Sequence, residues 1–355
     1  MSVLLPVSSL TGRSANEHVA LEHRIQKLPI LVLSPHSHCN CRCVMCDIWK
    51  IREVREITAD DLRTQLASFG ELGIEWVVFS GGEALLHTHL SLLAKLLREE
   101  GMRLTLLTTG LLLERQAEMV ATYFDDVIVS LDGPPAVHDR VRRVQRAFTQ
   151  LAHGVRALRE RKPAFPSTAR CTIQKLNHHS LVATARAAQE IGLDSISFLA
   201  VDAVSEAFNR PRGWEQDRQR AILLSEKEVE VLAAEVEQLI VEYHAGRANS
   251  FVAETPKKLR RIVHQFRAAL CQGEAVSPRC NAPWVSAVIE ATGEVRPCFF
   301  HSPVGNIHEA SLAEIINGPR ALAFRQSLDI ATNPICRRCV CSLYRPQENR
   351  SARAS

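Results

Sequence analysis

The chain has 355 residues, which is long for one average domain and suits a large domain joined to a smaller one. Its hydrophobic content of 46% and charged content of 23% are ordinary for a globular protein, and a net charge of +4 is too mild to indicate a nucleic-acid partner. No run of about 18 apolar residues predicts a transmembrane helix, and the first residues lack the basic start and apolar stretch of a secretory signal.

From residue 30 to about residue 200, short apolar strands alternate with amphipathic helices. The predicted strands are 30–33, 75–79, 103–107, 126–130, 169–174 and 195–199. The predicted helices are 59–72, 90–100, 113–122, 148–160 and 180–191. The alternation is typical of βαβ units around a parallel sheet, either doubly wound or curved into a partial barrel. In both arrangements functional groups gather at the carboxyl ends of the strands.

Chemically distinctive segments follow the first four predicted strands. A cysteine loop follows the first strand, and residues 80–83 (Ser-Gly-Gly-Glu) follow the second. Residues 108–110 (Thr-Thr-Gly) follow the third strand, and residues 131–133 (Leu-Asp-Gly) follow the fourth. Because these ends meet at one edge of a parallel sheet, the four segments predict a single active site.

The cysteine loop contains Cys39, Cys43 and Cys46 at the spacing C-x3-C-x2-C. Three thiolates on one short loop can hold three irons of a cubane cluster and leave the fourth iron without a protein ligand. An open metal position is typical of catalytic rather than structural metal sites. A zinc site is the alternative for such a spacing.

This loop resembles the cluster loop of the radical S-adenosylmethionine (AdoMet) enzymes. The resemblance implies a partial (β/α)6 TIM-like barrel, a 4Fe–4S cluster held by Cys39, Cys43 and Cys46, and AdoMet chelated by the open iron. It also implies the chemistry of the family, in which an electron from the cluster splits AdoMet into methionine and a 5′-deoxyadenosyl radical that abstracts a substrate hydrogen.

The resemblance extends to the other strand ends. Residues 80–83 match the Gly-Gly-Glu motif that holds the AdoMet ammonium, although a glycine pair alone is more often a turn. Residues 130–133 and His138-Asp139-Arg140-Val141-Arg142 resemble the "SLDG…HDxxR" segment of members with an auxiliary-cluster domain. The implied cofactor-binding residues are Met45, Ser80, Gly81, Gly82, Glu83, Thr108, Ser130, Asp132 and Arg142, with Thr109, Arg170 and Gln174 as further candidates.

Two positions depart from the family pattern. Met45 stands before the third cysteine where an aromatic residue usually stacks on adenine, and its thioether can still pack on a ring edge. Arg143 follows the motif arginine where the family often has glycine, which puts the turn in doubt. Cys41 lies inside the loop as an extra thiol, expected to be a bystander.

Residues 203–225 are polar and predict a long loop that contacts substrate or covers the site. A helix is predicted over 224–243, with Ser225 as N-cap and Glu228 three residues later, and another over 255–270. Short strands are predicted at 284–290 and 295–299. The tail after Arg345 is predicted to be disordered.

The chain has eleven cysteines, and their clustering favours metal ligation in a reducing cytoplasm over disulfides. The C-terminal set Cys280, Cys298, Cys336 and Cys339 would form a closed site for zinc or for a 4Fe–4S cluster. It resembles the "twitch" half of the SPASM domain family, which implies one auxiliary 4Fe–4S cluster. Cys271 and Cys341 are spare thiols and the alternatives to a predicted ligand.

The predicted organisation is an N-terminal extension (1–29), the barrel (30–225), linking helices (226–270), a small α+β twitch/SPASM-like domain (271–345) and a tail (346–355).

The predicted function is oxidation of a small-molecule or sugar-like substrate, with electron transfer through the auxiliary cluster; few residues precede the first strand to recognise a peptide. The alternatives are a peptide-modifying maturase and a non-catalytic iron–sulfur or zinc protein. A flavodoxin or ferredoxin is the expected electron donor. The sequence leaves several candidates for an acid, base or radical relay: Tyr123, His138, Cys171, Asp202, Glu206 and His301.

Overall fold

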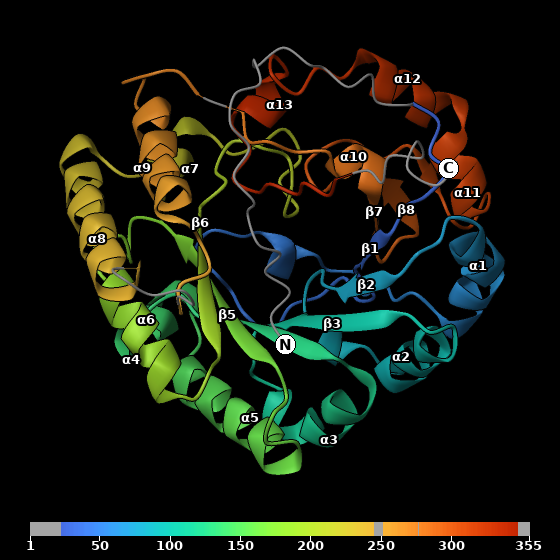
Figure 1. Cartoon of the computed structure of the whole chain (residues 1–355), viewed down its shortest axis with the longest axis horizontal. Helices are drawn as coiled ribbons and strands as arrows, with labels where there is room; N and C mark the ends of the chain where they lie inside the picture. The colour runs from blue at the N-terminus through green and yellow to red at the C-terminus, as the bar shows by residue number, and fades with distance from the viewer. Residues whose placement is uncertain (1–22, 245–250, 276, 347–355) are drawn as a thin grey trace, which may run out of the picture.

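The computed structural model describes residues 23–244, 251–275 and 277–346. The six predicted parallel strands are present and pair in chain order. Their bounds are β1 Ile30–Leu33, β2 Trp76–Phe79, β3 Arg103–Thr108, β4 Asp126–Ser130, β5 Ser167–Ile173 and β6 Ser195–Ala200. The strands form a curved inner sheet in Figure 1, so the predicted α/β fold is confirmed and the barrel alternative holds.

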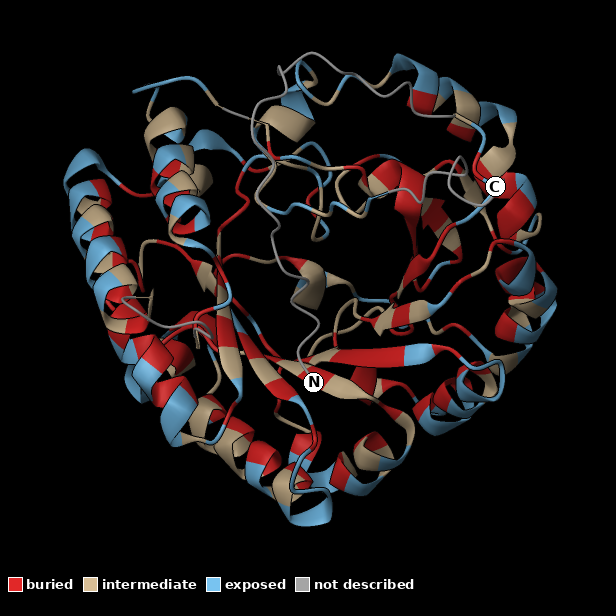
Figure 2. Ribbon diagram, in the orientation of Figure 1, coloured by how far each residue is buried: buried red, intermediate tan, exposed pale blue. Residues whose placement is uncertain are grey.

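Helices cover the outer side of this sheet (Figure 1). They are α1 Ala59–Glu71, α2 Leu90–Glu99, α3 Leu113–Tyr123, α4 Pro135–Arg142, α5 Ala147–Arg161 and α6 Leu181–Glu190. In α2 the buried residues are Leu90, Leu93, Ala94 and Leu97, which is the spacing of one helical face. Figure 2 shows the same division around the rim, with buried stripes facing the sheet and exposed stripes facing outwards.

The sequence predicted neither helix α4 nor the turn that follows it. Pro135 occupies the first turn of α4, where its missing N–H costs no hydrogen bond. The helix ends at Arg143, which has φ 53° and ψ 41° in the left-handed region. This is the position where the family often has glycine, because only glycine adopts that conformation without steric cost. Arg143 therefore forms the turn in a backbone conformation that is strained for a residue with a side chain.

The predicted loop after β6 contains one short helix, α7 Gln216–Arg220. The predicted helices beyond it are α8 Glu226–His244 and α9 Pro256–Ala269. At the start of α8, the backbone N–H and the hydroxyl of Ser225 both donate to Glu228 Oε2 at 2.8 Å. This contact confirms that Ser225 and Glu228 mark the beginning of the helix.

The C-terminal region extends the inner sheet. Its strands are β7 Ser286–Ile289, β8 Glu294–Arg296 and β9 Gly305–Asn306. Strand β7 runs parallel to β1 and pairs with it over its whole length, so the sheet order is β6-β5-β4-β3-β2-β1-β7-β8-β9. Gly293, at φ +81°, makes the turn between β7 and β8.

The first predicted C-terminal strand begins too early, because residues Ala282–Val285 form the helical turn α10. The second ends at Arg296 rather than at residue 299. The remaining elements are short: 3-10 helices η1 Ile48–Lys50 and η2 Ala84–Leu86, and helices α11 Leu312–Asn317, α12 Pro319–Ser327 and α13 Pro334–Arg337. Residues 1–22 of the predicted extension and 347–355 of the predicted tail lie outside the described residues.

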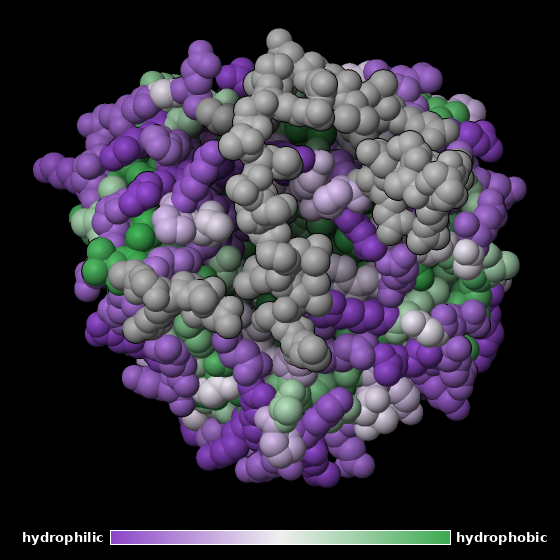
Figure 3. All heavy atoms as spheres, in the orientation of Figure 1, coloured by the Kyte–Doolittle hydropathy of each residue, from purple (hydrophilic) through white to green (hydrophobic). Residues whose placement is uncertain are grey.

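The outer faces of the rim helices are mainly hydrophilic. In Figure 3 the hydrophobic atoms form small separate groups between hydrophilic ones on the face that is shown. Within the described part of the chain, no helix combines the length and the apolar character needed to cross a membrane.

Candidate active site

The cysteine loop leaves the carboxyl end of β1 and borders a cavity of about 220 Å³. Cys39, Cys43 and Cys46 all line this cavity. Two backbone hydrogen bonds attach the loop to the end of α4, from Arg42 N to Arg142 O and from Val44 N to Val141 O, both at 3.1 Å. The predicted trio of thiols is therefore brought together on one wall.

Each of the three thiols receives an N–H donor. The backbone N–H of Cys41 points to Cys39 Sγ at 3.4 Å, that of Ile48 points to Cys46 Sγ at 3.4 Å, and Arg142 Nη1 lies 3.5 Å from Cys43 Sγ. A hydrogen bond from the Cys41 thiol, together with the charge of Arg142, lowers the pKa of Cys43 to about 7. Donors of this kind stabilise thiolates, the form that ligates iron.

This environment fits a cluster site with three cysteine ligands. All three thiols are unpaired by disulfides and face the same space. Among the described residues no three His, Cys, Asp or Glu side chains are grouped to hold a single metal ion. Cys41 is buried and does not line the cavity, as expected for a bystander thiol.

The glycine pair after β2 lies directly beneath the cysteine loop. Gly82 N donates to His36 O at 3.3 Å, and Glu83 N donates to His38 O at 2.8 Å. A Cβ at Gly82 would stand 2.0 Å from His38 O, and one at Gly81 would stand 2.8 Å from Ser34 Cβ. Gly81, Gly82 and Ser80 line the cavity, so the pair is needed for loop packing as well as for access to a ligand.

Glu83 was expected to contact the cofactor, and its carboxylate is instead occupied by protein donors. It accepts from Thr108 Oγ1 at 2.8 Å, from Thr109 N at 2.7 Å and from Leu85 N at 3.1 Å. Glu83 is 1% exposed and is not among the residues lining the cavity. Thr108 and Thr109 do line it, so Glu83 fixes the end of β3 against the glycine pair.

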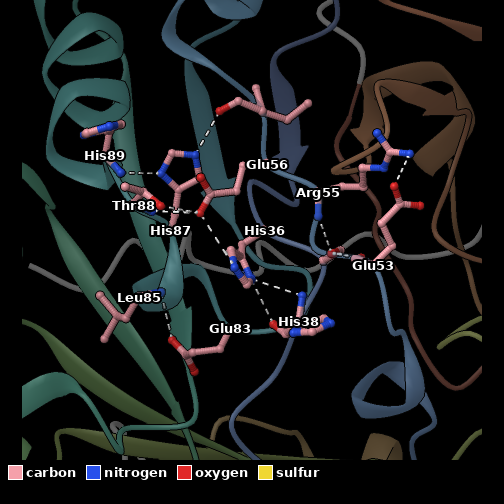
Figure 4. Close-up of polar contacts among 12 residues, drawn as sticks. His36, His38, Glu53, Arg55, Glu56, Glu83, Leu85, His87, Thr88 and His89 are labelled. Atoms are coloured by element: carbon pink, nitrogen blue, oxygen red, sulfur yellow. Dashed lines mark hydrogen bonds and ion pairs between the residues drawn. The ribbon is translucent and has the colours of Figure 1, made fainter.

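His36 in the cysteine loop and Thr88 in the segment after the glycine pair both contact Glu56 (Figure 4). His36 Nε2 lies 3.7 Å from Glu56 Oε1, which also accepts from Thr88 N at 2.8 Å. His36 Nδ1 accepts from His38 N at 3.0 Å, and His87 Nε2 lies 2.9 Å from Ile57 O. Burial lowers the pKa of His87. These contacts hold the loop in place without presenting a group to the cavity.

Arg142 lines the cavity at less than a tenth exposed. Its Nη2 pairs with Asp132 Oδ2 at 2.6 Å, and its Nη1 reaches Cys43. Asp132 was also expected to contact the cofactor, but it is fully buried behind Arg142 and accepts from Thr172 N at 2.8 Å. Asp132 therefore positions Arg142.

His138 also lies behind this pair. Asp132 N donates to His138 Nδ1 at 3.1 Å, and burial, with a further effect of Arg142, lowers the pKa of His138 to about 3. The imidazole is thus neutral and does not reach the cavity.

Met45 and Ser130 line the cavity, as predicted. Gln174 does not line it, but its Nε2 lies 3.8 Å from Met45 Sδ and fixes that side chain from behind. Gln174 is fully buried, and its Oε1 has no hydrogen-bond partner among the residues that the structure describes.

A second group of lining residues, which we call the distal wall, comes from the middle and the C-terminal part of the chain. It contains Arg170 and five residues that the sequence did not single out, namely Leu199, Val201, Phe208, Phe300 and Val340. Cys341 also lies here and not with the other C-terminal cysteines. The Phe299-Phe300 pair after Cys298 was the sequence signal for this wall.

Residues 202–218, which we call the cover segment, are attached to the cysteine loop. Asp47 is the main anchor: its N–H donates to Phe208 O at 3.2 Å, and its Oδ2 accepts from Trp214 Nε1 at 2.7 Å. Arg218 Nη2 donates to Val44 O at 2.7 Å. The segment therefore closes one side of the cavity, in line with the predicted role of this loop.

A second, smaller cavity is lined by Cys280, Cys298, Cys336 and Cys339. This is the full set predicted for the auxiliary site, and Cys271 and Cys341 are absent from it. Burial raises the pKa of Cys298 to about 11. Phe300 lines both cavities, so the two groups of thiols border cavities that share one aromatic side chain.

Of the acid, base or relay candidates, one lines the first cavity. Asp202 does so, but its carboxylate accepts from Ser205 Oγ and pairs with Arg210. His301 lines the second cavity. The others line neither: Tyr123, His138, Cys171 and Glu206.

Two family models match the chain. Residues 33–188 match the radical SAM superfamily, and residues 280–340 match the SPASM iron–sulfur cluster-binding domain. Among curated relatives, Fe-coproporphyrin III synthase of Methanosarcina barkeri is 24% identical over 83% of this chain and 75% of that protein. The subtilosin biosynthesis protein AlbA of Bacillus subtilis is 24% identical over 87% of this chain and 64% of that protein.

Solved structures share the fold. Streptococcus suis SuiB bound to its precursor peptide SuiA has a TM-score of 0.63 at 16% identity, covering 91% of this chain and 73% of that chain. AdoMet-bound anSMEcpe has a TM-score of 0.62 at 17% identity, covering 83% and 82%. The chain therefore belongs to the radical SAM superfamily, as an enzyme that uses AdoMet and a 4Fe–4S cluster and carries a C-terminal iron–sulfur cluster-binding domain.

Proposed function

We propose that this enzyme abstracts the hydrogen atom of a C–H bond and then takes one further electron from a substrate that carries an anionic group. When bound, AdoMet and the two clusters supply a 5′-deoxyadenosyl radical for hydrogen abstraction and an acceptor for the second electron. The observation that carries the proposal is the shared wall: Phe300 borders both the cavity beside Cys39, Cys43 and Cys46 and the second cysteine set. The oxidised substrate then releases a proton to solvent.

Within this proposal the chain's residues have separate tasks. Cys39, Cys43 and Cys46 hold the catalytic cluster, and Cys280, Cys298, Cys336 and Cys339 hold the auxiliary one. The residues that line the cavity next to the loop bind AdoMet: Met45, Ser80, Gly81, Gly82, Thr108, Ser130 and Arg142. Glu83 and Asp132 position them through the buried contacts described above.

The distal wall carries a cationic side chain, Arg170, which favours an anionic substrate. Arg170 projects from β5, its Nε lies 3.4 Å from Ser197 Oγ, and no ion pair joins it to any residue that the structure describes. Among the described residues that line the cavity, Asp202 is the acidic one, and Arg210 neutralises it. A guanidinium without an ion-pair partner in a cavity is suited to bidentate recognition of a carboxylate.

The rest of the distal wall favours an apolar substrate body over a sugar-like one. Leu199, Val201, Phe208, Phe300 and Val340 offer no hydrogen-bonding side chains. Relatives named as Fe-coproporphyrin III synthase and AdoMet-dependent heme synthase, the latter 26% identical over 78% of this chain, support a tetrapyrrole bearing carboxylates as the first substrate to test.

Peptide modification is the second candidate. AlbA, named for the biosynthesis of a bacteriocin, aligns with 87% of this chain. The cavity of about 220 Å³ is small for a ligand pocket, so only the reacting part of either substrate, one edge of a tetrapyrrole or one side chain of a peptide, would enter it. An Asp or Glu side chain would satisfy Arg170 in the same way.

The first test is an anaerobic reconstitution followed by an iron count. About eight irons per chain are expected, the load of two 4Fe–4S clusters. Loss of about four after substitution of either cysteine set would support the assignment. About four irons together with one zinc would make the C-terminal site structural and remove its role in electron transfer.

The second test measures 5′-deoxyadenosine with AdoMet, a chemical reductant and a probe substrate. Fe-coproporphyrin III, which has four carboxylates, is compared with its tetramethyl ester, and the peptides encoded beside the gene are assayed in parallel. Turnover of the acid that Arg170→Leu abolishes and Arg170→Lys partly retains supports the anionic substrate. Peptide turnover alone would favour a maturase, and no AdoMet cleavage under any condition would leave a non-catalytic protein.

A further inference from the structure

One histidine stands at the auxiliary cysteine site without having been assigned a role. His301 lies three residues after Cys298, is 5% exposed and lines the second cavity. Its Nε2 lies 3.4 Å from Cys336 Sγ. This is within reach of an N–H···S hydrogen bond, which is longer than a bond to oxygen because sulfur is larger.

The position of the ring is fixed on both sides. His301 N donates to Cys298 O at 3.3 Å, and His301 O accepts from Arg296 Nη1 at 3.1 Å. The imidazole packs edge-on against Phe324, with 4.8 Å between the ring centroids. Held by these contacts, Nε2 faces the sulfur rather than solvent.

The chemistry of the partner determines which nitrogen carries the proton. A cysteine that ligates iron is a thiolate and has no hydrogen to donate. The contact between His301 and Cys336 is therefore favourable only when the imidazole donates from Nε2. A donor aimed at a ligand sulfur favours the reduced state of a cluster, which carries one more negative charge, and burial strengthens the effect.

We propose that His301 donates an Nε2–H hydrogen bond to Cys336 Sγ and so raises the reduction potential of the auxiliary cluster. This inference rests on the proposed ligand set Cys280, Cys298, Cys336 and Cys339. His301 acts through Cys336 and does not touch substrate. A higher potential makes the auxiliary cluster a better acceptor for the second electron taken from the substrate.

The test isolates the auxiliary cluster. The full-length variant Cys39→Ala/Cys43→Ala/Cys46→Ala lacks the catalytic ligands and should hold about four irons. In this parent, His301→Leu removes the donor, and His301→Gln keeps an amide N–H. His308→Leu is the matched control, because His308 is half-exposed in the same region and its Nε2 faces Asp61 Oδ1 at 3.3 Å. The midpoint potential of each variant is measured by redox titration followed by EPR.

The expected result is a shift to a more negative potential in His301→Leu only. At the parent's midpoint, the ratio of reduced to oxidised cluster should fall about tenfold, the effect of losing one charge-assisted hydrogen bond. His301→Gln should recover most of the shift.

Three outcomes would overturn the inference. An unchanged potential in His301→Leu would show that the contact does not act on the cluster. Loss of iron in His301→Gln as well as in His301→Leu would make His301 a ligand or a structural residue instead. A parent variant without iron would refute the proposed auxiliary ligand set, and the role of His301 with it.

Discussion

Gly82, after the second strand, leaves no room for a side chain beside the cysteine loop. In Gly82→Ala the new Cβ would meet the backbone atoms His38 O at 2.0 Å and His38 C at 2.5 Å, and neither can rotate away. The loop must shift, at a cost of about 3 kcal/mol. We expect the variant to lose the iron of the catalytic site and to cleave AdoMet at less than a hundredth of the normal rate, measured as iron per chain and as 5′-deoxyadenosine.

Gly70→Ala is the matched control for this substitution. Gly70 lies in α1, and nothing stands within 4 Å of its added Cβ. Alanine should stabilise the helix by up to about 1 kcal/mol and leave iron content unchanged. Full iron and full cleavage activity in Gly82→Ala would contradict the packing argument, because the close approach to His38 would then have no consequence.

Substitution of Arg143 by glycine is expected to stabilise the protein, whereas Gly82→Ala is expected to destabilise it. The left-handed conformation of Arg143, φ 53°, costs a residue with a side chain about 1 kcal/mol relative to glycine. Arg143 is exposed, and no described contact depends on its side chain. Arg143→Gly should therefore raise the free energy of unfolding by about 1 kcal/mol, read from urea denaturation. Arg143→Ala removes the same charge but keeps the Cβ, so an equal gain there would assign the effect to charge instead.

At the residue scale the sequence predicted which local groups lie together, but not which distant partners surround them, and the roles of Glu83 and Asp132 in cofactor binding stay predictions. Cys39, Cys43 and Cys46 share one short loop, so their spacing alone predicted a common site. Glu83 and Asp132 carry motif carboxylates, but their donors come from Thr108, Thr109 and Arg142 elsewhere in the chain. Sequence alone does not show that those donors would occupy the carboxylates and leave them behind the cavity wall.

At the scale of elements, periodicity predicted the long helices and the six barrel strands to within a few residues. The missed elements are short: α4 begins at a proline and has eight residues, and α10 has only four. A pattern of 3.6 residues needs several turns to stand out. The cover segment was predicted as a loop from its composition, but its contact with Asp47 joins residues far apart in sequence.

The cover segment gives a prediction at this scale, because a buried ion pair holds it in shape. Arg210 is 1% exposed; its Nη1 donates to Asp202 O at 2.8 Å, and its Nη2 pairs with the Asp202 carboxylate. Removing one partner of such a pair costs about 3–5 kcal/mol, since the other charge stays buried. Arg210→Met should open the segment, so that trypsin cleaves within 202–218 much faster than in the unsubstituted chain.

A double variant separates the charge from the packing. In Asp202→Asn/Arg210→Met no unpaired charge remains, and protection from trypsin should return in part. Arg186→Met is the control, because its pair with Glu242 is exposed and contributes little. Equal cleavage of all three variants would show that the ion pair does not hold the segment.

At the scale of the whole molecule, the strand alternation predicted six parallel strands but not the continuation of their sheet. Strand β7 (286–289) pairs with β1 (30–33), and no local sequence pattern predicts a contact between residues so far apart in the chain. Buried polar contacts add to this joint: Gln65 in α1 donates to Ile307 O at 3.1 Å and accepts from Leu312 N at 2.8 Å. The predicted domain boundary near residue 271 stays a prediction. The two parts that it would divide share one sheet.

This continuity predicts that the barrel strands and the C-terminal strands unfold together. The chain has four tryptophans, of which Trp76 lies in β2 and Trp284 lies just before β7. Two variants that each keep one of these tryptophans and replace the rest by phenylalanine report separately on the barrel and on the C-terminal region. Because β1 pairs with both β2 and β7, their fluorescence transitions in urea should have the same midpoint and the same slope. A C-terminal transition at clearly lower urea would mean that the shared strand does not couple the two parts, and that the cluster-binding region is a separate folding unit.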